Sequence, residues 1–170
     1  IYRIGFGEEI AVSMSDDGQG ADAAAGDAVY TAVIPASAYQ AGQMVRWYVR
    51  AADAQGMATR NPAFLLPNNS PEYFGTVVRD PSVQPPLQTL YYFVRDTAAE
   101  GTETGTRCSV FYMDEFYDNV FIRLRGGFYA ASTGSRKIDF NDGEKFLFHP
   151  RFDRVDEINL NGQGADITFI

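Results

Sequence analysis

The sequence predicts a mainly β chain of two antiparallel parts with very little helix. Apolar and polar residues alternate with a period of two in several short runs, and glycine, asparagine and aspartate stand between these runs. No stretch carries the 3.6-residue period of an amphipathic helix. All but two of the eight prolines fall in residues 61–86, where neither a central strand nor a helix interior is expected.

The first part, residues 1–78, is expected to form a β-sandwich module of immunoglobulin or fibronectin type, because short strands alternate with turn residues. Its expected strands cover residues 1–4, 8–14, 28–35, 44–52, 57–60 and 73–78. In the clearest of them, Val45 and Trp47 fall on the face expected to be buried, and Arg46 falls on the opposite face.

Residues 79–86 are expected to form a proline-rich linker, and residues 87–170 a second antiparallel sheet. The expected strands of this sheet cover residues 87–94, 107–112, 117–125, 137–140, 145–148 and 155–160. A hairpin is predicted across residues 113–116, and Asn141-Asp142-Gly143 is a strong turn signal. The chain begins inside an expected strand and stops at Thr168-Phe169-Ile170 without terminal punctuation, so we expect a fragment of a longer protein.

Composition excludes several classes of function. The chain has 170 residues and a formal net charge of −8, without the basic patch that nucleic acid or anionic lipid would require. No apolar run approaches the roughly 20 residues of a membrane span. Cys108 is the only cysteine and is expected to be buried, and the only histidine, His149, is expected to be structural.

An aspartate-rich loop at residues 16–27 is the candidate metal site. It carries four carboxylates among glycines, namely Asp16, Asp17, Asp22 and Asp27. Calcium takes six to eight oxygen ligands, and such a cluster supplies several of them, although the spacing is not that of an EF-hand. The alternative is a turn-rich loop whose aspartates accept hydrogen bonds from backbone N–H groups, and the sequence favours this alternative.

A glycine-containing loop between two expected strands is the candidate phosphate site. Its members combine flexible backbone with positive charge: Arg125, Gly126, Gly127, Ser135, Arg136 and Lys137. Backbone N–H groups beside glycines can approach phosphate oxygens, and a lysine adds a point charge. The alternative is an ordinary hairpin loop with solvated basic residues.

Four segments of the second part together resemble one protein family. They are Phe116–Val120, Arg123–Gly127, Lys137–Gly143 and Glu157–Asn161. Their spacing resembles the N-terminal part of the CotH family, the spore-coat protein H-like atypical protein kinases that also occur in large secreted bacterial proteins. The resemblance covers residues 87–170. The first part looks like the sandwich module often placed before such domains.

The resemblance implies that residues 87–170 form an incomplete N-lobe-like sheet of a kinase-like fold. The full-length protein would then bind ATP and Mg²⁺ and transfer phosphate to protein hydroxyl groups, at the cell surface or outside the cell. Family members carry their metal-binding and catalytic aspartates further along, beyond Ile170, so no catalytic residue is assigned here and the fragment itself is expected to be inactive. Members usually carry another basic residue before the serine, where Thr133-Gly134-Ser135 stands in this chain, so the phosphate lysine is either Lys137 or a neighbour. The alternative function is a non-catalytic extracellular adhesion or wall-associated binding module.

Overall fold

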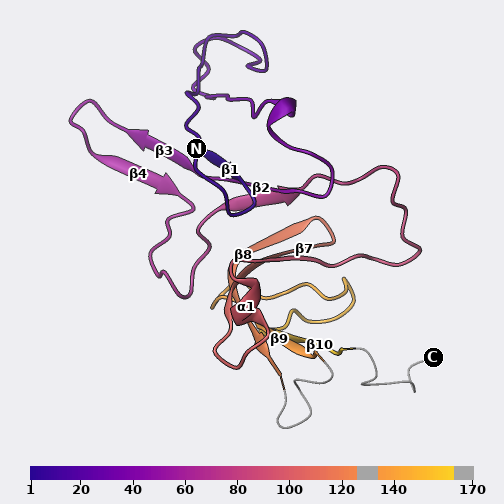
Figure 1. Cartoon of the computed structure of the whole chain (residues 1–170). Coiled ribbons are helices and arrows are strands. Elements are labelled where there is room, and N and C mark those ends of the chain that lie inside the picture. The colour runs from indigo at the N-terminus through magenta and orange to yellow at the C-terminus, as the bar shows by residue number, and fades with distance from the viewer. Residues whose placement is uncertain (126–133, 163–170) are drawn as a thin grey trace.

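The computed structural model describes residues 1–125 and 134–162, and within them the chain is mainly β. The elements, in chain order, are β1 (Tyr2–Ile4), the 3-10 helix η1 (Ala36–Ala38), β2 (Met44–Trp47), β3 (Val49–Ala52), β4 (Ala58–Asn61), β5 (Phe74–Val77), β6 (Tyr91–Val94), α1 (Thr97–Glu100), β7 (Thr106–Tyr112), β8 (Glu115–Leu124), β9 (Arg136–Asp139) and β10 (Glu157–Leu160). All strand pairs are antiparallel, as predicted (Figure 1). Across the described ranges, neither helix has the length that a membrane span requires.

The N-terminal part contains a three-stranded sheet in the order β1-β2-β5 and a separate two-stranded ribbon, β3-β4 (Figure 1). The single strand expected over residues 44–52 is therefore divided at Tyr48 between two sheets. The strands expected at residues 8–14 and 28–35 reduce to isolated pairings, Tyr2 with Ile10 and Ser15 with Thr31.

The structure corrects the prediction of which face of residues 44–52 is buried. Val45 is buried, but Arg46 on the other face is only 1% exposed, whereas Val49 is 37% exposed. Alternation predicts which residues share a face, and both faces of β2 turn out to be covered. The burial of Arg46 depends on an ionic partner from the second part of the chain, described below.

The described residues of the C-terminal part form one five-stranded sheet in the order β10-β9-β8-β7-β6, in which consecutive strands are neighbours. The predicted hairpin is confirmed: β7 and β8 meet at Met113 and Asp114, both with positive φ, as a two-residue turn between twisted strands requires. The strand expected at residues 145–148 reduces to a single pairing of Phe146 with Val155.

One face of this sheet forms a hydrophobic core. Its buried members are Cys108, Val110, Tyr117, Val120, Ile122, Ile138, Phe140 and Phe146. The segment that follows β9 covers this face, since Phe140 and Phe146 stack with ring centroids 4.9 Å apart. The burial predicted for Cys108 is confirmed.

A β-bulge interrupts the pairing of β7 with β8. Cys108 pairs with Val120 but Val110 pairs with Tyr117, so one more residue is inserted on β8 than on β7. The inserted residue is accommodated at Asn119, which has a φ of 54°. Bulges redirect side chains, and this one directs Asp118 toward the N-terminal part rather than into the core.

We predict that the Cys108 thiol is inert in the folded chain. Burial, followed by the nearby Asp118 charge, raises its pKa above the ordinary range, and the thiolate is the reactive species. Labelling with a thiol reagent at pH 8 should be at least about 10³-fold slower than in denaturant, because it requires unfolding of the sheet. Stoichiometric labelling of the denatured chain is the control, and rapid labelling in native buffer would contradict the placement of Cys108.

Candidate functional site

The candidate phosphate lysine lies on the sheet face opposite the core. Side chains alternate along β9, so Lys137 and Asp139 share the face that Ile138 does not occupy. Across the strand pairs, Lys137 lies opposite Arg123 of β8 and Asp139 lies opposite Glu157 of β10. Like charges therefore lie directly across from each other, and opposite charges lie on the diagonals.

The diagonal contacts hold the lysine in place. Lys137 Nζ lies 2.5 Å from Glu157 Oε2 and 2.9 Å from Asp139 Oδ1. The hydrogen bond to Glu157 raises the pKa of Lys137 most, and the hydrogen bond to Asp139 raises it further, so the lysine stays cationic. Arg123 Nε lies a looser 3.9 Å from Asp139 Oδ2. The result is a lysine with a fixed position on the polar face of the sheet.

Arg136, also predicted for the phosphate group, faces the other way. It shares the core-side face with Ile138, and its guanidinium binds both carboxylate oxygens of Glu100 in α1, at 2.5 and 3.1 Å. Asp96 caps the start of α1 by accepting hydrogen bonds from two backbone N–H groups. Arg136 thus anchors α1 to the sheet and is separated from Lys137.

Arg125 and Ser135 lie next to each other at the end of the β8-β9 pair. The backbone N–H of Arg125 donates to the carbonyl of Ser135, and the Arg125 guanidinium donates to Asn161 Oδ1 at 3.2 Å. Ser135 Oγ accepts from the N–H of Gly162 at 3.1 Å. Gly126 and Gly127 lie outside the described residues.

The aspartate-rich loop lies at the far end of the N-terminal part, away from the five-stranded sheet (Figure 1). Asp16, Asp22 and Asp27 each place one carboxylate oxygen within 4.8 Å of the others. Asp17, the fourth predicted member, instead accepts a hydrogen bond from the N–H of Gln19 at 3.0 Å. The structure therefore brings together three of the four predicted residues.

Hydrogen bonds from backbone N–H groups shape this loop. Asp16 accepts from the N–H groups of Gly26, Asp27 and Ala28, which joins the two ends of the loop. Asp22 Oδ2 accepts from the N–H of Gly18 at 2.7 Å. The turn chemistry predicted as the alternative is thus present, in the same residues whose carboxylates converge.

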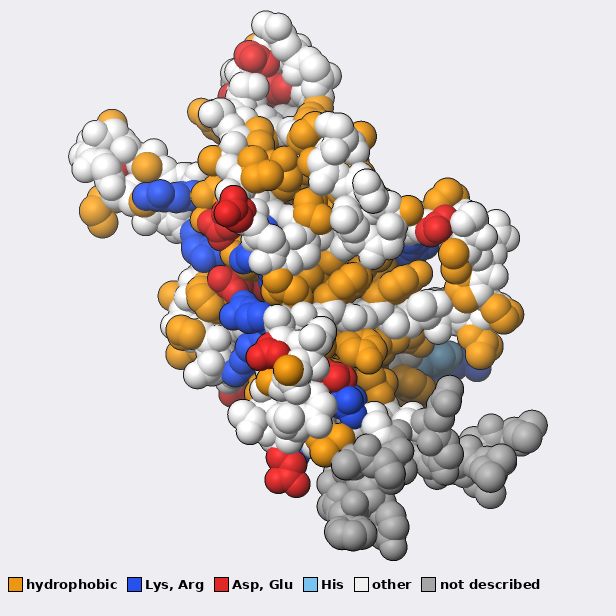
Figure 2. Space-filling model, in the orientation of Figure 1, with side chains coloured by type: hydrophobic (Ala, Val, Ile, Leu, Met, Phe, Trp, Pro, Cys, Tyr) orange, Lys and Arg blue, Asp and Glu red, His pale blue; other side chains and the backbone are white. Residues whose placement is uncertain are grey.

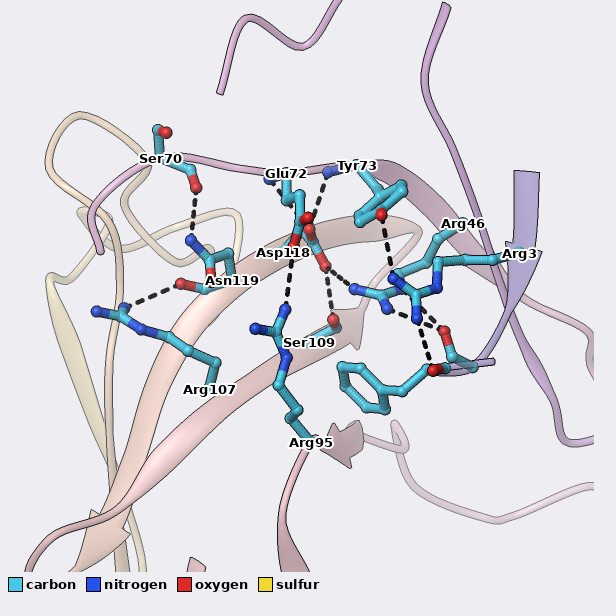
Figure 3. Close-up of polar contacts among 12 residues, drawn as sticks. Arg3, Arg46, Ser70, Glu72, Tyr73, Arg95, Arg107, Ser109, Asp118 and Asn119 are labelled. Atoms are coloured by element: carbon cyan, nitrogen blue, oxygen red, sulfur yellow. Dashed lines mark hydrogen bonds and ion pairs between the residues drawn. The ribbon is translucent and has the colours of Figure 1, made fainter. Parts of the chain in front are cut away.

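A buried polar cluster joins the two parts of the chain, and the sequence analysis missed it. At its centre is Asp118, which is 1% exposed (Figure 3). Its Oδ1 accepts from Arg46 Nη1 at 3.1 Å and from Ser109 Oγ at 2.6 Å. Its Oδ2 accepts from the N–H groups of Glu72 and Tyr73 at 3.1 and 2.9 Å. Both carboxylate oxygens therefore accept hydrogen bonds, and the donors come from the N-terminal and the C-terminal parts of the chain.

Arg46 is equally enclosed. Its Nε and Nη2 donate to the carbonyl of Gly5, and its guanidinium lies between the rings of Phe6 and Tyr73, 4.4 and 4.5 Å from their centroids. Desolvation lowers the pKa of Arg46, and the charge of Asp118 acts against this shift. Charged side chains are almost never fully buried unless paired, so the ion pair explains how an arginine occupies this interior.

Two further contacts reinforce the junction, one made by Asn119 and one by Phe116. The Asn119 amide donates to the carbonyl of Ser70 at 2.9 Å (Figure 3). It also donates to the carbonyl of Pro67, at 2.9 Å. Gly75 of β5 packs directly against the ring of Phe116. An aspartate and an asparagine in the middle of a largely apolar strand were the sequence signal for this junction, but that signal does not name the partner.

The fold and these sites define a mainly β protein whose two antiparallel parts share a buried ionic junction. Its polar sheet face carries a fixed lysine, and its distal loop gathers three carboxylates. Comparison with protein-family models, curated proteins and solved structures finds no match to this chain.

Proposed function

We propose that this chain is the N-terminal part of a secreted bacterial phosphotransferase of the CotH type, and that Lys137 contacts nucleotide phosphate in the longer protein. In this proposal the sheet β6–β10 is the N-lobe-like part of a kinase-like domain, and residues 1–78 are its preceding sandwich module. The observation that carries the proposal is the position of Lys137, fixed by Glu157 on the polar face of the sheet.

The charges on this face fit a phosphate group. Protein kinases hold the lysine that contacts ATP phosphates in an ion pair with a glutamate, although that glutamate comes from a helix and not from a neighbouring strand. By strand pairing, Arg123 and Arg125 share the face of Lys137, next to the predicted glycine loop. Arg136 is not assigned a nucleotide contact, because Glu100 binds its Nε and Nη2 and the carbonyl of Ser135 accepts from its Nη1.

ATP bound with Mg²⁺ would supply the transferable phosphoryl group, and the protein residues on this face would position it by charge. Lys137 would neutralise phosphate oxygens, while Glu157 and Asp139 would orient the lysine. A protein hydroxyl is the proposed acceptor. The isolated chain is expected to bind ATP weakly, since the resemblance places the metal-binding aspartates after Ile170.

Lys137→Ala in the longer protein should lower phosphotransfer by about 10²-fold, the size of one lost electrostatic contact to the reacting phosphate. The measurement is kcat/KM for transfer of labelled phosphate from Mg-ATP to a protein substrate. Lys145→Ala is the matched control, since Lys145 is the other lysine and pairs with Asp156 at 3.4 Å. It should retain wild-type activity. Equal activity of the two variants would remove Lys137 from the mechanism.

The alternative, a non-catalytic extracellular adhesion or wall-associated module, is favoured by a different observation. An apolar cavity of about 450 Å³ lies beside β1 and β2, where the space-filling view shows hydrophobic side chains at the surface (Figure 2). Its lining includes Val12, Met14, Val33 and Trp47. A longer protein that transfers no phosphate from Mg-ATP, while still folded, would favour this function over the phosphotransferase.

A further inference from the structure

One oxygen in the aspartate-rich loop has no hydrogen-bond partner. Asp22 is 6% exposed, and its Oδ1 is buried without any donor among the residues that the structure describes. Its other oxygen is satisfied by the N–H of Gly18. A carboxylate oxygen removed from water and left unpaired is costly, typically about 1–3 kcal/mol and more for a charged group. Something other than the protein backbone is needed to stabilise this oxygen.

Asp22 does not stand alone, because one carboxylate oxygen each of Asp16, Asp22 and Asp27 lies within 4.8 Å of the others. Three carboxylates at this separation repel one another, and no Lys or Arg side chain pairs with them among the described ion pairs. Figure 2 shows acidic side chains near the tip of the loop, at the top of the molecule. A bound cation would neutralise the repulsion among the carboxylates and would give the unpaired oxygen a partner.

We infer that Asp16, Asp22 and Asp27 bind a divalent cation, and that the cation is calcium. The trio offers only carboxylate oxygens, which suit hard cations and disfavour zinc or copper, whose sites use histidine and cysteine. Calcium tolerates irregular oxygen geometry in a flexible loop, whereas magnesium demands a near-octahedral site. Asp22 also lines a surface cavity of about 230 Å³.

The backbone hydrogen bonds of the loop prepare the site. The three N–H groups that bind Asp16 bring Asp27 close to Asp16, although ten residues separate them in the chain. The N–H of Gly18 orients the carboxylate of Asp22. The loop is thus closed by its aspartates before a cation arrives, and the cation occupies positions that the N–H groups leave open. This site is independent of Lys137 and of the proposed phosphotransferase function.

Calcium binding to the 170-residue chain tests the inference directly. Isothermal titration at constant ionic strength should give one calcium per chain with a Kd of about 10⁻⁴–10⁻³ M, the range of extracellular calcium modules. The melting temperature should rise by about 3–8 °C between excess EDTA and 10 mM CaCl₂, because the cation binds the folded loop only. Identical melting in EDTA and in calcium, with no binding heat, would overturn the inference.

Two isosteric variants separate a built site from general attraction of calcium to an acidic chain. Asp22→Asn should weaken calcium binding by at least tenfold and abolish the rise in melting temperature. Asp17→Asn makes the same charge change in the same loop, at an exposed residue outside the trio. In this variant the calcium Kd and the calcium-induced rise in melting temperature should both stay within twofold of the wild-type values. Equal losses in the two variants, or a larger response to magnesium than to calcium, would overturn the assignment.

The melting of Asp22→Asn in EDTA provides a check on its fold. Replacing the unpaired oxygen by an amide nitrogen supplies a donor to the neighbouring carboxylates, so this variant should melt at or above the wild-type temperature without calcium. A variant that is folded and no longer responds to calcium supports the site. A variant that is folded and responds like the wild type contradicts it.

Discussion

Asp118→Ala is expected to destabilise the folded chain by about 3–5 kcal/mol, the cost of removing one partner of a buried ion pair. The substitution leaves the Arg46 guanidinium without its counter-ion in a site that is 1% exposed. It also removes the acceptor of Ser109 Oγ and of the N–H groups of Glu72 and Tyr73. Each buried donor left unsatisfied adds its own desolvation cost.

The same variant should uncouple the two parts of the chain. Trp47, the only tryptophan, reports on β2 by fluorescence, and labelling of Cys108 reports on β7. In the wild type the urea midpoints of the two probes should coincide, because Asp118 takes ligands from both parts. In Asp118→Ala the Trp47 transition should move to lower urea by more than the Cys108 transition.

Two control variants test the cause of this effect. Ser109→Ala removes a single hydrogen bond from the same carboxylate and should cost only about 1 kcal/mol. Combining Arg46→Met with Asp118→Leu removes both charges and should be less destabilising than Asp118→Ala alone, since no charge is then left unpaired. An Asp118→Ala chain within about 1 kcal/mol of the wild type would show that the junction does not hold the parts together.

Gly105→Ala is expected to cost about 2–4 kcal/mol, from a left-handed backbone and a steric overlap together. Gly105 precedes β7 with a φ of +66°. A methyl group there would overlap the carbonyl oxygen of Ile122 and lie 2.7 Å from the Phe121 ring. Because that oxygen belongs to the backbone of the central strand β8, it cannot move aside without disturbing the sheet.

Gly143→Ala separates the two contributions. Gly143 has a similar φ of +81°, but a methyl group there would meet no atom within 4 Å. It should therefore show the backbone cost alone, about 1–2 kcal/mol. Urea unfolding followed by circular dichroism measures both variants. Equal destabilisation by the two substitutions would contradict the close packing of Gly105 against β8.

Local pattern was sufficient to predict most strands of the C-terminal sheet, although the strand expected at residues 145–148 reduces to a single pairing. Alternation and turn residues gave the β7-β8 hairpin and the strands near β9 and β10, because neighbours in this sheet are also neighbours in the chain. The N-terminal part was predicted less well. Its strands β1, β2 and β5 pair across long intervals of sequence, and residues 44–52 divide between two sheets, which no local period encodes.

The candidate sites divide in the same way. The loop residues Asp16, Asp22 and Asp27 were predicted from composition, and the structure adds the unpaired oxygen of Asp22. Lys137 was predicted from its place after a glycine loop, but its pairing with Glu157 depends on the register of β9 with β10. Strand alternation places Arg136 on the opposite face from Lys137, whereas its pairing with Glu100 depends on the fold.

The sequence by itself determined a mainly β chain, most strands of its C-terminal sheet and the residue types available for a cation or a phosphate. Only the tertiary structure decided that Arg46 and Asp118, 72 residues apart, are buried together. The physical reason is that alternation specifies the face on which a side chain lies, whereas burial of a charge depends on a partner brought there by folding. A charged residue in an amphipathic strand therefore looks solvent-facing until its counter-ion is known.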